Sequence, residues 1–160
     1  LFLTPDAEQV KNQINIQNKK ARFEYHLLEE FVAGIQLAGT EIKSIRNAKA
    51  SILEAYCVFE NGEVWIRNMH IAMYENSSFY QHKPRSDRKL LLNKKEINKI
   101  EKFLKDKGNT LIPVKMFISE KGWAKMVIAC AKGKKLHDKR QDLKEKADKR
   151  DVDRVLKGIR

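Results

Sequence analysis

The sequence predicts a mainly β protein: a small closed antiparallel barrel of the OB type, with a short helix, one longer inserted helix and a basic C-terminal tail that is helical only when bound. Three observations lead to this fold class. Two pairs of alternating apolar runs flank glycine-containing turns, a glycine lies within another such run, and a helical stripe precedes the second pair. Short strands with these features favour a small closed barrel over a sandwich.

The beginning of the chain contains an expected helix and an expected strand. Thr4 begins a short helix, because Pro5 suits the first helical position and acidic residues follow in the first turn. Residues 22–37 alternate between apolar and polar side chains, as a strand with one buried face does. Gly34 within this strand indicates a bulge or a close approach of two backbones.

The next segment predicts a short helix and a hairpin. Thr40 is expected as the N-cap of a helix over residues 40–46, where two isoleucines lie three positions apart. Two alternating runs, residues 51–59 and 63–69, then flank Asn61-Gly62. Because both of these residues tolerate positive φ, the pair predicts a type I′ turn.

A polar loop, a helix and a second hairpin are expected after residue 73. Residues 74–88 are polar and include a proline, which is typical of a loop. Asn93 and Glu96 have the spacing of a capping box, and an apolar helical stripe follows until Gly108. Residues 110–130 predict the second hairpin. Four lysines of the helix are assigned to its solvent face: Lys94, Lys95, Lys102 and Lys105.

The charge balance indicates a polyanionic partner. The chain has 33 lysines and arginines against 21 acids, a formal net charge of +12 and a pI near 9.7. Such an excess of positive charge is informative about binding partners rather than about the fold, and it favours nucleic acid over a membrane surface as the partner. No apolar run approaches the ~18 residues of a membrane-spanning helix, and the first residues lack the basic flank of a signal peptide. We expect a cytoplasmic protein.

The two cysteines, Cys57 and Cys130, are expected to be buried and reduced. Both lie in apolar alternating runs, and neither has a second cysteine or a histidine at metal-ligand spacing. Reduced thiols fit a cytosolic compartment. No metal or other cofactor is expected.

Charge also divides the chain into an N-terminal extension (1–14), a barrel (15–131) and a C-terminal tail (132–160). The tail holds twelve basic and six acidic residues, so half of the net charge lies in 29 residues. Oppositely charged pairs four residues apart would stabilise a helix there by ~0.2–0.5 kcal/mol each. The apolar stripe of the tail is too thin to hold it on the barrel, so we expect disorder in isolation and a helix when docked.

Catalysis is not expected. The sequence contains no G-x-S-x-G, Walker or H-E-x-x-H motif. His137-Asp138 is an adjacent acid–base pair, but it lies in a tail without the rigid support that catalysis needs. An RNA-processing enzyme that uses His137 stays an alternative, which a His137→Ala variant with unchanged RNA cleavage would exclude. The other histidines are assigned ordinary surface or packing roles: His26, His70 and His82.

Four basic segments are candidates for nucleic-acid binding. Any one of them is more often a solvated face, but four around one small barrel account for the excess charge through contacts with RNA phosphates. The segments are Asn18-Lys19-Lys20-Ala21-Arg22, the charges between Glu41 and Lys49, Arg85-Ser86-Asp87-Arg88-Lys89, and Lys132-Gly133-Lys134-Lys135.

Three longer strings make the sequence recognisable. In chain order they are Gly39-Thr40-Glu41-Ile42-Lys43-Ser44-Ile45-Arg46, Lys89-Leu90-Leu91-Leu92-Asn93 and Ala131-Lys132-Gly133-Lys134-Lys135-Leu136-His137-Asp138-Lys139-Arg140. Together they resemble the small protein B (SmpB) family, the tmRNA-binding or SsrA-binding proteins of bacteria. The resemblance extends from about Asn15 to the C-terminus.

The resemblance implies a protein without catalytic activity that binds the tRNA-like domain of tmRNA and delivers it to stalled ribosomes for trans-translation. It also implies that the barrel stands in for the missing anticodon arm. The tail would enter the empty mRNA channel near the decoding centre of the ribosome, beside 16S rRNA, and become helical there. Elongation factor Tu and alanyl-tRNA synthetase would act on the same tmRNA complex. The chain itself is expected to be a monomer without membrane contact.

Carried over residue by residue, the resemblance implies two sets of functional residues. The tmRNA-binding set is Asn18, Lys19, Lys20, Arg22, Glu41, Lys43, Ser44, Arg46, Lys89, Leu91, Leu92, Lys132, Gly133, Lys134 and Lys135. The set for the decoding centre and the mRNA channel is His137, Asp138, Lys139, Arg140, Lys144, Lys146, Lys149 and Arg150. The ring of His137 is suited to stacking on a base while neighbouring cations hold phosphates.

Two positions depart from the pattern of the family. Val32 stands where many relatives have an acidic residue, so a hydrogen bond to RNA is expected to be lost or moved there. Ala48 stands where relatives commonly have glycine, which leaves open a different end of the short helix.

Two other binding classes stay open. A ribosomal or general tRNA-binding OB protein with a basic extension would order its tail in rRNA whatever occupies the mRNA channel. Protection of the tail from proteolysis only on ribosomes with an empty channel would argue against that class. A membrane-binding basic helix is the weaker alternative, because the apolar face of the tail is limited to Val152, Val155, Leu156 and Ile159.

Overall fold

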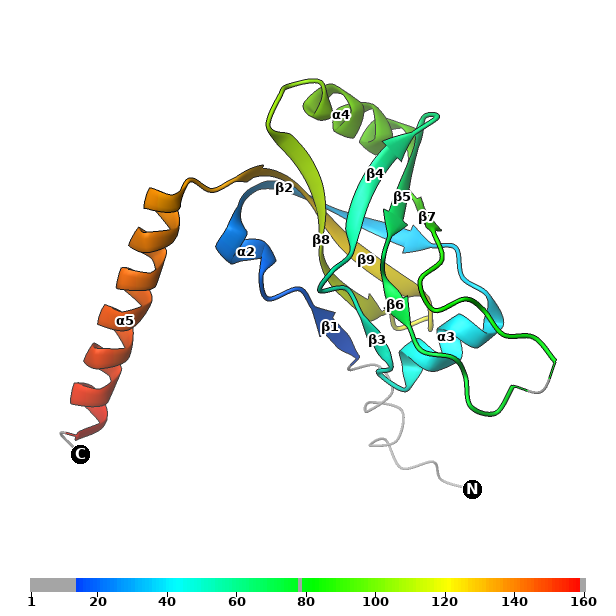
Figure 1. The fold of residues 1–160 in the computed structure, drawn as a ribbon, viewed down its shortest axis with the longest axis horizontal. Coiled ribbons are helices and arrows are strands. Elements are labelled where there is room, and N and C mark those ends of the chain that lie inside the picture. Colours follow the sequence, from blue (N-terminus) through cyan, green and yellow to red (C-terminus); the bar gives the residue numbers. More distant parts are fainter. Residues whose placement is uncertain (1–13, 78, 159–160) are drawn as a thin grey trace.

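The computed structural model describes residues 14–77 and 79–158 (Figure 1). The helix expected from Thr4 lies outside these residues. A seven-stranded antiparallel sheet forms the body, with the strand order β1-β8-β9-β2-β7-β5-β4. Its strands are β1 Asn15–Gln17, β2 Tyr25–Ile35, β4 Tyr56–Glu60, β5 Glu63–Arg67, β7 Arg88–Leu91, β8 Asn109–Ile118 and β9 Ala124–Gly133. The strands β3 Ala50–Ser51 and β6 His70–Ile71 pair separately.

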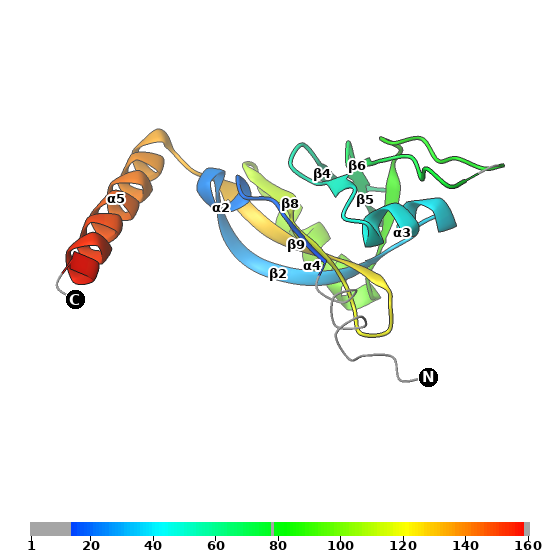
Figure 2. The same cartoon turned by 90° about the horizontal axis from the view of Figure 1, so that it is seen from below.

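Four helices accompany the strands in the described part of the chain: α2 Ala21–Glu24, α3 Gly39–Arg46, α4 Lys94–Leu104 and α5 Leu136–Gly158. The α4 helix covers the top of the body in Figure 1, and Ile100 on its inner face is fully buried in the core. The α5 helix projects from the body on the side opposite to α3 (Figure 1; Figure 2). The α5 helix lies within the C-terminal tail (132–160), and the sheet with the other helices is called the body below.

The prediction of a closed barrel is wrong. The described edge strands are β1 and β4, and no hydrogen-bonded ladder joins them to each other or joins β4 to β8. The alternating run 51–59 is divided, because Ser51 joins the small sheet with His70 and leaves only five residues for β4. Side-chain packing covers this side instead, since Cys57 of β4 and Leu111 of β8 belong to one buried cluster.

Both predicted hairpins are confirmed. Asn61 and Gly62 have φ values of 52° and 75° and join β4 to β5, as a type I′ turn requires. The second hairpin pairs β8 with β9, and its turn contains Gly122 at a φ of 85°. The predicted strand over residues 22–37 begins later than expected, because residues 21–24 form the single turn α2 around the buried Ala21.

Gly34 is expected to mark either a bulge or a close approach of two backbones, and the close approach is confirmed. A Cβ atom at Gly34 would lie 3.3 Å from the Cβ of Leu91 on the neighbouring strand β7, so the two backbones approach closely. The bulge of β2 is found elsewhere, between Leu27 and Glu29. Strand β7 itself was not predicted.

The helix starts follow two different rules. The Asn93 side chain accepts a 2.9 Å hydrogen bond from the Glu96 N–H, so the predicted cap of α4 is confirmed. The prediction of Thr40 as the cap of α3 is wrong. The N-cap is Ala38, whose N–H donates to the Glu41 carboxylate at 3.2 Å. The side chain of Glu41, at the third position of the helix, therefore caps the start of α3.

Cys57 and Cys130 are buried and reduced, as predicted. Desolvation raises the pKa of the Cys57 thiol far above its ordinary value. It also raises the pKa of Cys130 to about 11, and the nearby Glu29 carboxylate adds to this shift. Neither thiol is therefore ionised at neutral pH.

The tail forms a helix of 23 residues with no buried side chain. The predicted helix is confirmed, but it is present here in the chain alone rather than only in a bound state. Asp142–Lys146 and similar pairs of opposite charge four residues apart support such a helix locally.

Candidate nucleic-acid interface

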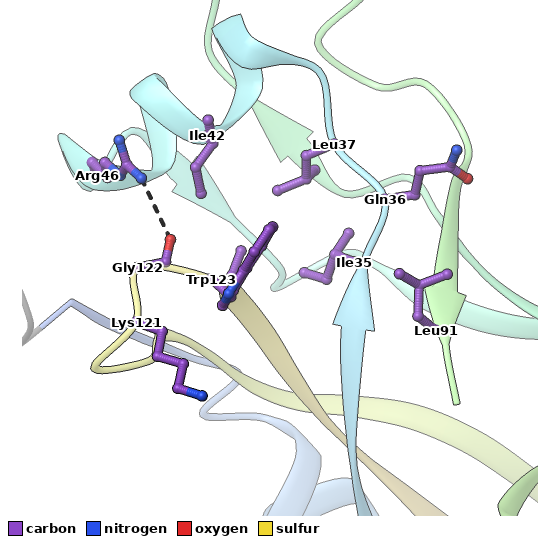
Figure 3. A pocket seen from close by; sticks show the side chains of 10 residues that line it. Ile35, Gln36, Leu37, Ile42, Arg46, Leu91, Lys121, Gly122 and Trp123 are labelled. Atoms are coloured by element: carbon purple, nitrogen blue, oxygen red, sulfur yellow. Dashed lines mark hydrogen bonds between the residues drawn. The ribbon is translucent and has the colours of Figure 1, made fainter. Parts of the chain in front are cut away.

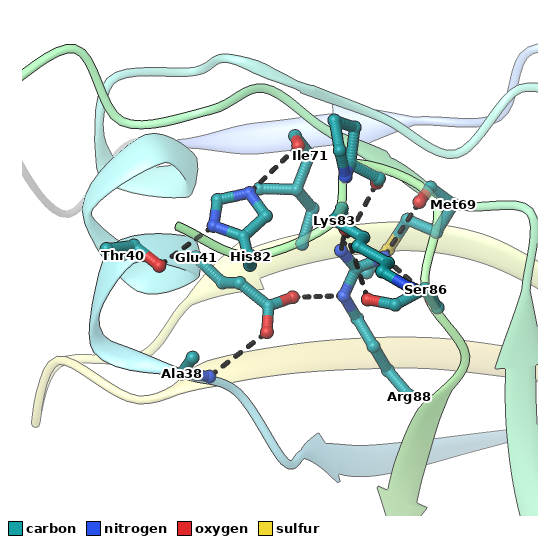
Figure 4. Close-up of polar contacts among 10 residues, drawn as sticks. Ala38, Thr40, Glu41, Met69, Ile71, His82, Lys83, Ser86 and Arg88 are labelled. Atoms are coloured by element: carbon teal, nitrogen blue, oxygen red, sulfur yellow. Dashed lines mark hydrogen bonds and ion pairs between the residues drawn. The ribbon is translucent and has the colours of Figure 1, made fainter. Parts of the chain in front are cut away.

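A buried ion pair fixes the position of the short helix α3 (Figure 4). The Arg88 guanidinium donates through Nε to the Glu41 carboxylate, and the two side chains are only 2% and 9% exposed. Arg88 also donates to the carbonyl of Met69 at 2.8 Å and to that of Ser86 at 3.1 Å. Because these groups are satisfied together, the pair ties α3 to β7 and to the loop before it.

His82 is a second link to α3 (Figure 4). Its Nε2 lies 3.0 Å from the carbonyl oxygen of Ile71, which only a ring N–H can satisfy, so Nε2 donates. Its Nδ1 then accepts from the Thr40 hydroxyl at 2.8 Å. His82 is buried, so the packing role predicted for it is confirmed.

The α3 helix presents two faces with different tasks. Glu41 and Ser44 point into the protein, and Ser44 is only 1% exposed. Lys43 and Arg46 are exposed on the outer face. The Lys43 ammonium lies 5.3 Å from the centroid of the Tyr74 ring. Of the four α3 residues predicted to bind RNA, the structure therefore makes Lys43 and Arg46 accessible and encloses the other two.

An open pocket of about 440 Å³ lies between α3, the ends of β2 and β7, and the β8–β9 turn (Figure 3). Arg46 and Leu91, both predicted RNA-binding residues, meet Trp123 there. Trp123 is 67% exposed and Leu91 is 50% exposed. Sequence reasoning missed Trp123, although a tryptophan directly after a glycine turn, rather than inside a strand, signals an exposed ring.

The segment 89–92, most of which belongs to strand β7, contributes fewer accessible residues than its sequence suggests. Lys89 is held by the Glu63 carboxylate at 2.6 Å across the strand pair. Leu90 is buried, and Leu92 packs partly against the core. Leu91 is thus the accessible residue of this group.

The N-terminal turn before β2 places two cations outside the body. The Asn18 amide donates to the Pro113 carbonyl at 3.1 Å, and its backbone N–H donates to that of Val114 at 2.8 Å. These bonds anchor the turn to β8. Lys19 and Lys20 are exposed beside it.

The base of the tail is fastened to α2. The Lys134 ammonium donates to the Arg22 carbonyl at 2.8 Å and to the Asp142 carboxylate of α5. Its side chain is only 10% exposed, so Lys134 joins α2 to α5 within the protein rather than facing solvent. Lys132, Gly133 and Lys135 next to it are exposed.

Three further contacts hold α5 beside α2 and the start of β2. His26 Nε2 lies 3.2 Å from the Asp138 carboxylate. This hydrogen bond lowers the pKa of Asp138. Desolvation is the next largest cause and opposes it, and the Lys135 backbone N–H adds to the lowering. The ammonium groups of Lys139 and Lys146 lie 6.0 and 5.8 Å from the centroid of the Phe23 ring.

Within the described residues, the remaining predicted tail residues make no hydrogen bond, ion pair or cation–π contact with the body. They are exposed along α5: His137, Arg140, Lys144, Lys149 and Arg150. A second pocket of about 440 Å³ lies where α5 leaves the body, between the N-terminal turn and Asp142.

The two residues that depart from the pattern of the family, Val32 and Ala48, lie in different structural surroundings. Val32 is 55% exposed on β2. Ala48 has a φ of 57°, in the left-handed region that favours glycine. The α3 helix therefore ends with the backbone that a glycine would adopt, at a strain cost of roughly 1–2 kcal/mol for alanine.

The part of the chain that the structure describes contains neither a cluster of metal ligands nor a membrane-spanning helix. No group of three or more His, Cys, Asp or Glu side chains suited to a metal ion occurs there. Among the same residues, no helix is long and apolar enough to span a membrane.

Comparison with known proteins gives a consistent result. The family described as SmpB protein matches residues 15–158. An SsrA-binding protein of Bacteroides thetaiotaomicron is 56% identical over 144 residues, which cover 90% of this chain and 96% of the relative. An SsrA-binding protein of Agrobacterium fabrum is 46% identical over 152 residues, 95% of each chain.

A solved structure described as "tmRNA-SmpB: a journey to the center of the bacterial ribosome" is also similar. It has a TM-score of 0.64 and 41% sequence identity, and the match covers 77% of this chain and 86% of that one.

Proposed function

The chain belongs to the SmpB family, and we propose that it binds the tRNA-like domain of tmRNA and delivers it to stalled ribosomes for trans-translation. The relatives are SsrA-binding proteins, and the similar structure joins SmpB with tmRNA and the bacterial ribosome by its description. This function requires an RNA-binding surface and a part that contacts the ribosome. It requires no catalysis by the chain itself.

The observation that carries the proposal is the division of cations into paired and unpaired groups. Six exposed cations of the predicted tmRNA-binding set have no ion pair within the described residues: Lys19, Lys20, Lys43, Arg46, Lys132 and Lys135. Unpaired exposed cations are available to displace counterions from RNA phosphates, and this release drives binding. Arg88, Lys89 and Lys134 instead have acidic partners within the protein.

We assign the residues of the body two roles in RNA binding. Lys43, Arg46 and Leu91 would contact tmRNA directly on one side, and Lys19 and Lys20 would contact it on the other. The enclosed residues would act by positioning these groups, through the contacts of Asn18, Glu41, Ser44 and Lys134 within the protein. Arg22, Lys89, Leu92 and Gly133 complete the proposed interface.

The tail would occupy the empty mRNA channel. A helix of 23 residues is about 35 Å long at ~1.5 Å per residue. It buries no side chain, so its cations can face rRNA around the channel, 16S rRNA included. In this proposal the body (15–131) and the first residues of the tail (132–135) bind tmRNA, and the rest of the tail contacts the ribosome, with His137, Asp138, Lys139 and Arg140 near the decoding centre and Lys144, Lys146, Lys149 and Arg150 along the channel.

Further partners follow from the same assignment. Elongation factor Tu and alanyl-tRNA synthetase would act on the tmRNA complex rather than on the isolated chain. The chain would act as a monomer in the cytoplasm.

Direct binding tests the proposal. Full-length protein is titrated with transcribed tmRNA, with tRNA and with a ribosomal RNA fragment of similar length, each over a range of salt concentrations. We expect tmRNA to bind more tightly than the other two RNAs at every salt concentration. Equal affinity for the three RNAs would contradict the proposal and favour a general tRNA-binding or ribosomal protein.

A further inference from the structure

The pocket around Trp123, here called the Trp123 pocket, combines an apolar floor with a cationic rim (Figure 3). Ile35, Leu37 and Ile42 form the floor, and the Trp123 ring stands beside them. Arg46 and Lys121 lie at the rim, and the lining contains no acidic residue. Its volume of about 440 Å³ lies within the ~300–1,000 Å³ typical of small-ligand sites.

The pocket exposes apolar side chains to water on the surface of the protein. Trp123 and Leu91 leave half or more of their surface in water, and nothing in the described part of the chain covers them. Each Å² of apolar surface removed from water is worth roughly 25 cal/mol. A partner that covers the indole and the leucine therefore gains affinity from surface that the fold itself leaves unused.

The backbone that carries the Trp123 ring is fixed by a hydrogen-bonded turn. The Trp123 N–H donates to the Ser119 Oγ at 3.1 Å, and the Ser119 N–H donates to the Trp123 carbonyl at 2.8 Å. Arg46 Nη2 donates to the Gly122 carbonyl at 3.4 Å, which joins the turn to α3. The backbone around the pocket is therefore preorganised, and a ligand would have to order only the exposed side chains.

The chemistry of the lining indicates its occupant. A planar π-system can stack on the indole, and a phosphate on each side of it can reach a cation of the rim. A nucleotide whose base is unstacked has both features. An apolar side chain of a protein partner would fill the floor but would leave Arg46 and Lys121 without a complementary charge, which disfavours it.

We propose that the Trp123 pocket receives one unstacked nucleobase from a single-stranded loop of the RNA partner, with the base on the Trp123 indole and the flanking phosphates on Arg46 and Lys121. This inference rests on the proposed function. It names the base-contacting element of the interface, whereas the lysines around it contact only phosphates. Trp123 would thus determine which loop of the RNA is bound.

Substitution of Trp123 tests the proposal. Full-length Trp123→Ala is expected to bind tmRNA roughly ten-fold more weakly, a loss of about 1.4 kcal/mol, and Trp123→Phe to retain most of the affinity because it keeps a π-face. Leu28→Ala is the matched control, since Leu28 is an exposed apolar residue on β2 outside the pocket, and it should bind as the wild type does. Thermal unfolding confirms that each variant is folded.

An abasic scan of the RNA identifies the base. Single abasic nucleotides are placed at each unpaired loop position of the tRNA-like domain. At one position we expect the lost base to weaken binding by the wild type but to add nothing to the defect of Trp123→Ala. Wild-type affinity of Trp123→Ala, or equal penalties in both proteins at every position, would overturn the proposal.

The same titrations separate this proposal from the proposed function. If the wild type binds tmRNA specifically and Trp123→Ala binds equally well, the function stands and the base pocket is rejected. If the wild type shows no preference for tmRNA, both are rejected.

Discussion

The body and the tail of this protein are held in place by different kinds of interaction. In the body, a contiguous apolar cluster fixes the strands, and a buried ion pair with hydrogen-bonded neighbours fixes α3. In the tail, α5 buries no side chain, and its described links to the body are polar or cation–π contacts at its first turns. The position of the body surface is therefore specified by many interactions and that of the tail by few.

This difference suits the two tasks that we propose. An RNA surface that selects one partner gains from side chains held in one arrangement. A tail that enters a channel gains from contacts that a partner can replace, because each exposed ion pair is worth only about 0–1 kcal/mol. Rearrangement of α5 on the ribosome would thus cost little.

The largest expected effect of a substitution lies in the body, at the buried ion pair. Glu41→Gln leaves the Arg88 guanidinium buried without its carboxylate, which typically destabilises a protein by about 3–5 kcal/mol. Urea unfolding would measure the loss. The matched control is Glu54→Gln, because Glu54 pairs with Arg85 at 3.4 Å on the surface.

We expect the control to change the free energy of unfolding by less than about 1 kcal/mol. If the two variants were equally stable, the short helix would not depend on the Glu41–Arg88 pair, and the contrast between body and tail would lose its main support.

A smaller effect is expected at the surface of the body. Reversal of charge in Lys19→Glu/Lys20→Glu should weaken tmRNA binding by roughly ten-fold and lower the slope of log affinity against log salt, without unfolding the protein. Lys94→Glu/Lys95→Glu is the control, because these lysines are exposed on α4 away from the proposed interface. An unchanged salt slope in the first variant would remove the N-terminal turn from the interface.

Local features of the fold could be predicted from the sequence because they depend on neighbouring residues. Asn61-Gly62 specifies its turn, and Asn93 specifies a helix start, through bonds within a few positions. Closure of the sheet could not be predicted in this way, because it depends on which distant strand Ser51 joins. Side-chain alternation alone does not decide between those partners.

The candidate interface shows the same limit. The basic segments could be found from composition, but composition does not separate Lys43, which is exposed, from Lys134, which is enclosed by partners. Glu41 resembles a surface residue in a charged helix until its long-range partner Arg88 is known. Trp123 joined the site only when the fold brought the β8–β9 turn beside α3.

The smallest expected effect concerns the attachment of the tail. The lowered pKa of Asp138 means that its contact with His26 contributes fully above the ordinary Asp pKa of about 3.9 and is lost as the pH falls through the lowered value. We therefore expect α5 to move away from the start of β2 on acidification below about pH 4. Distances between spin labels on introduced surface cysteines would show this, because Cys57 and Cys130 are buried and unreactive.

Asp138→Asn is the control for the acid response. In this variant the distribution of distances between the labels should already be broad at neutral pH. Acidification should change that distribution less than it does in the wild type. An identical response of both proteins to pH would show that the His26–Asp138 contact does not hold the tail.

The division of labour between body and tail is tested most directly by truncation after Lys135, with tmRNA binding and peptide tagging on stalled ribosomes measured on the same preparation. The truncated protein keeps the whole sheet and the unpaired cations of the body. We predict tmRNA affinity within about three-fold of the wild type, since the removed helix buries no side chain and Lys134 keeps its bond to the Arg22 carbonyl, together with complete loss of tagging. Loss of tmRNA binding along with tagging, or tagging that survives the truncation, would contradict the account.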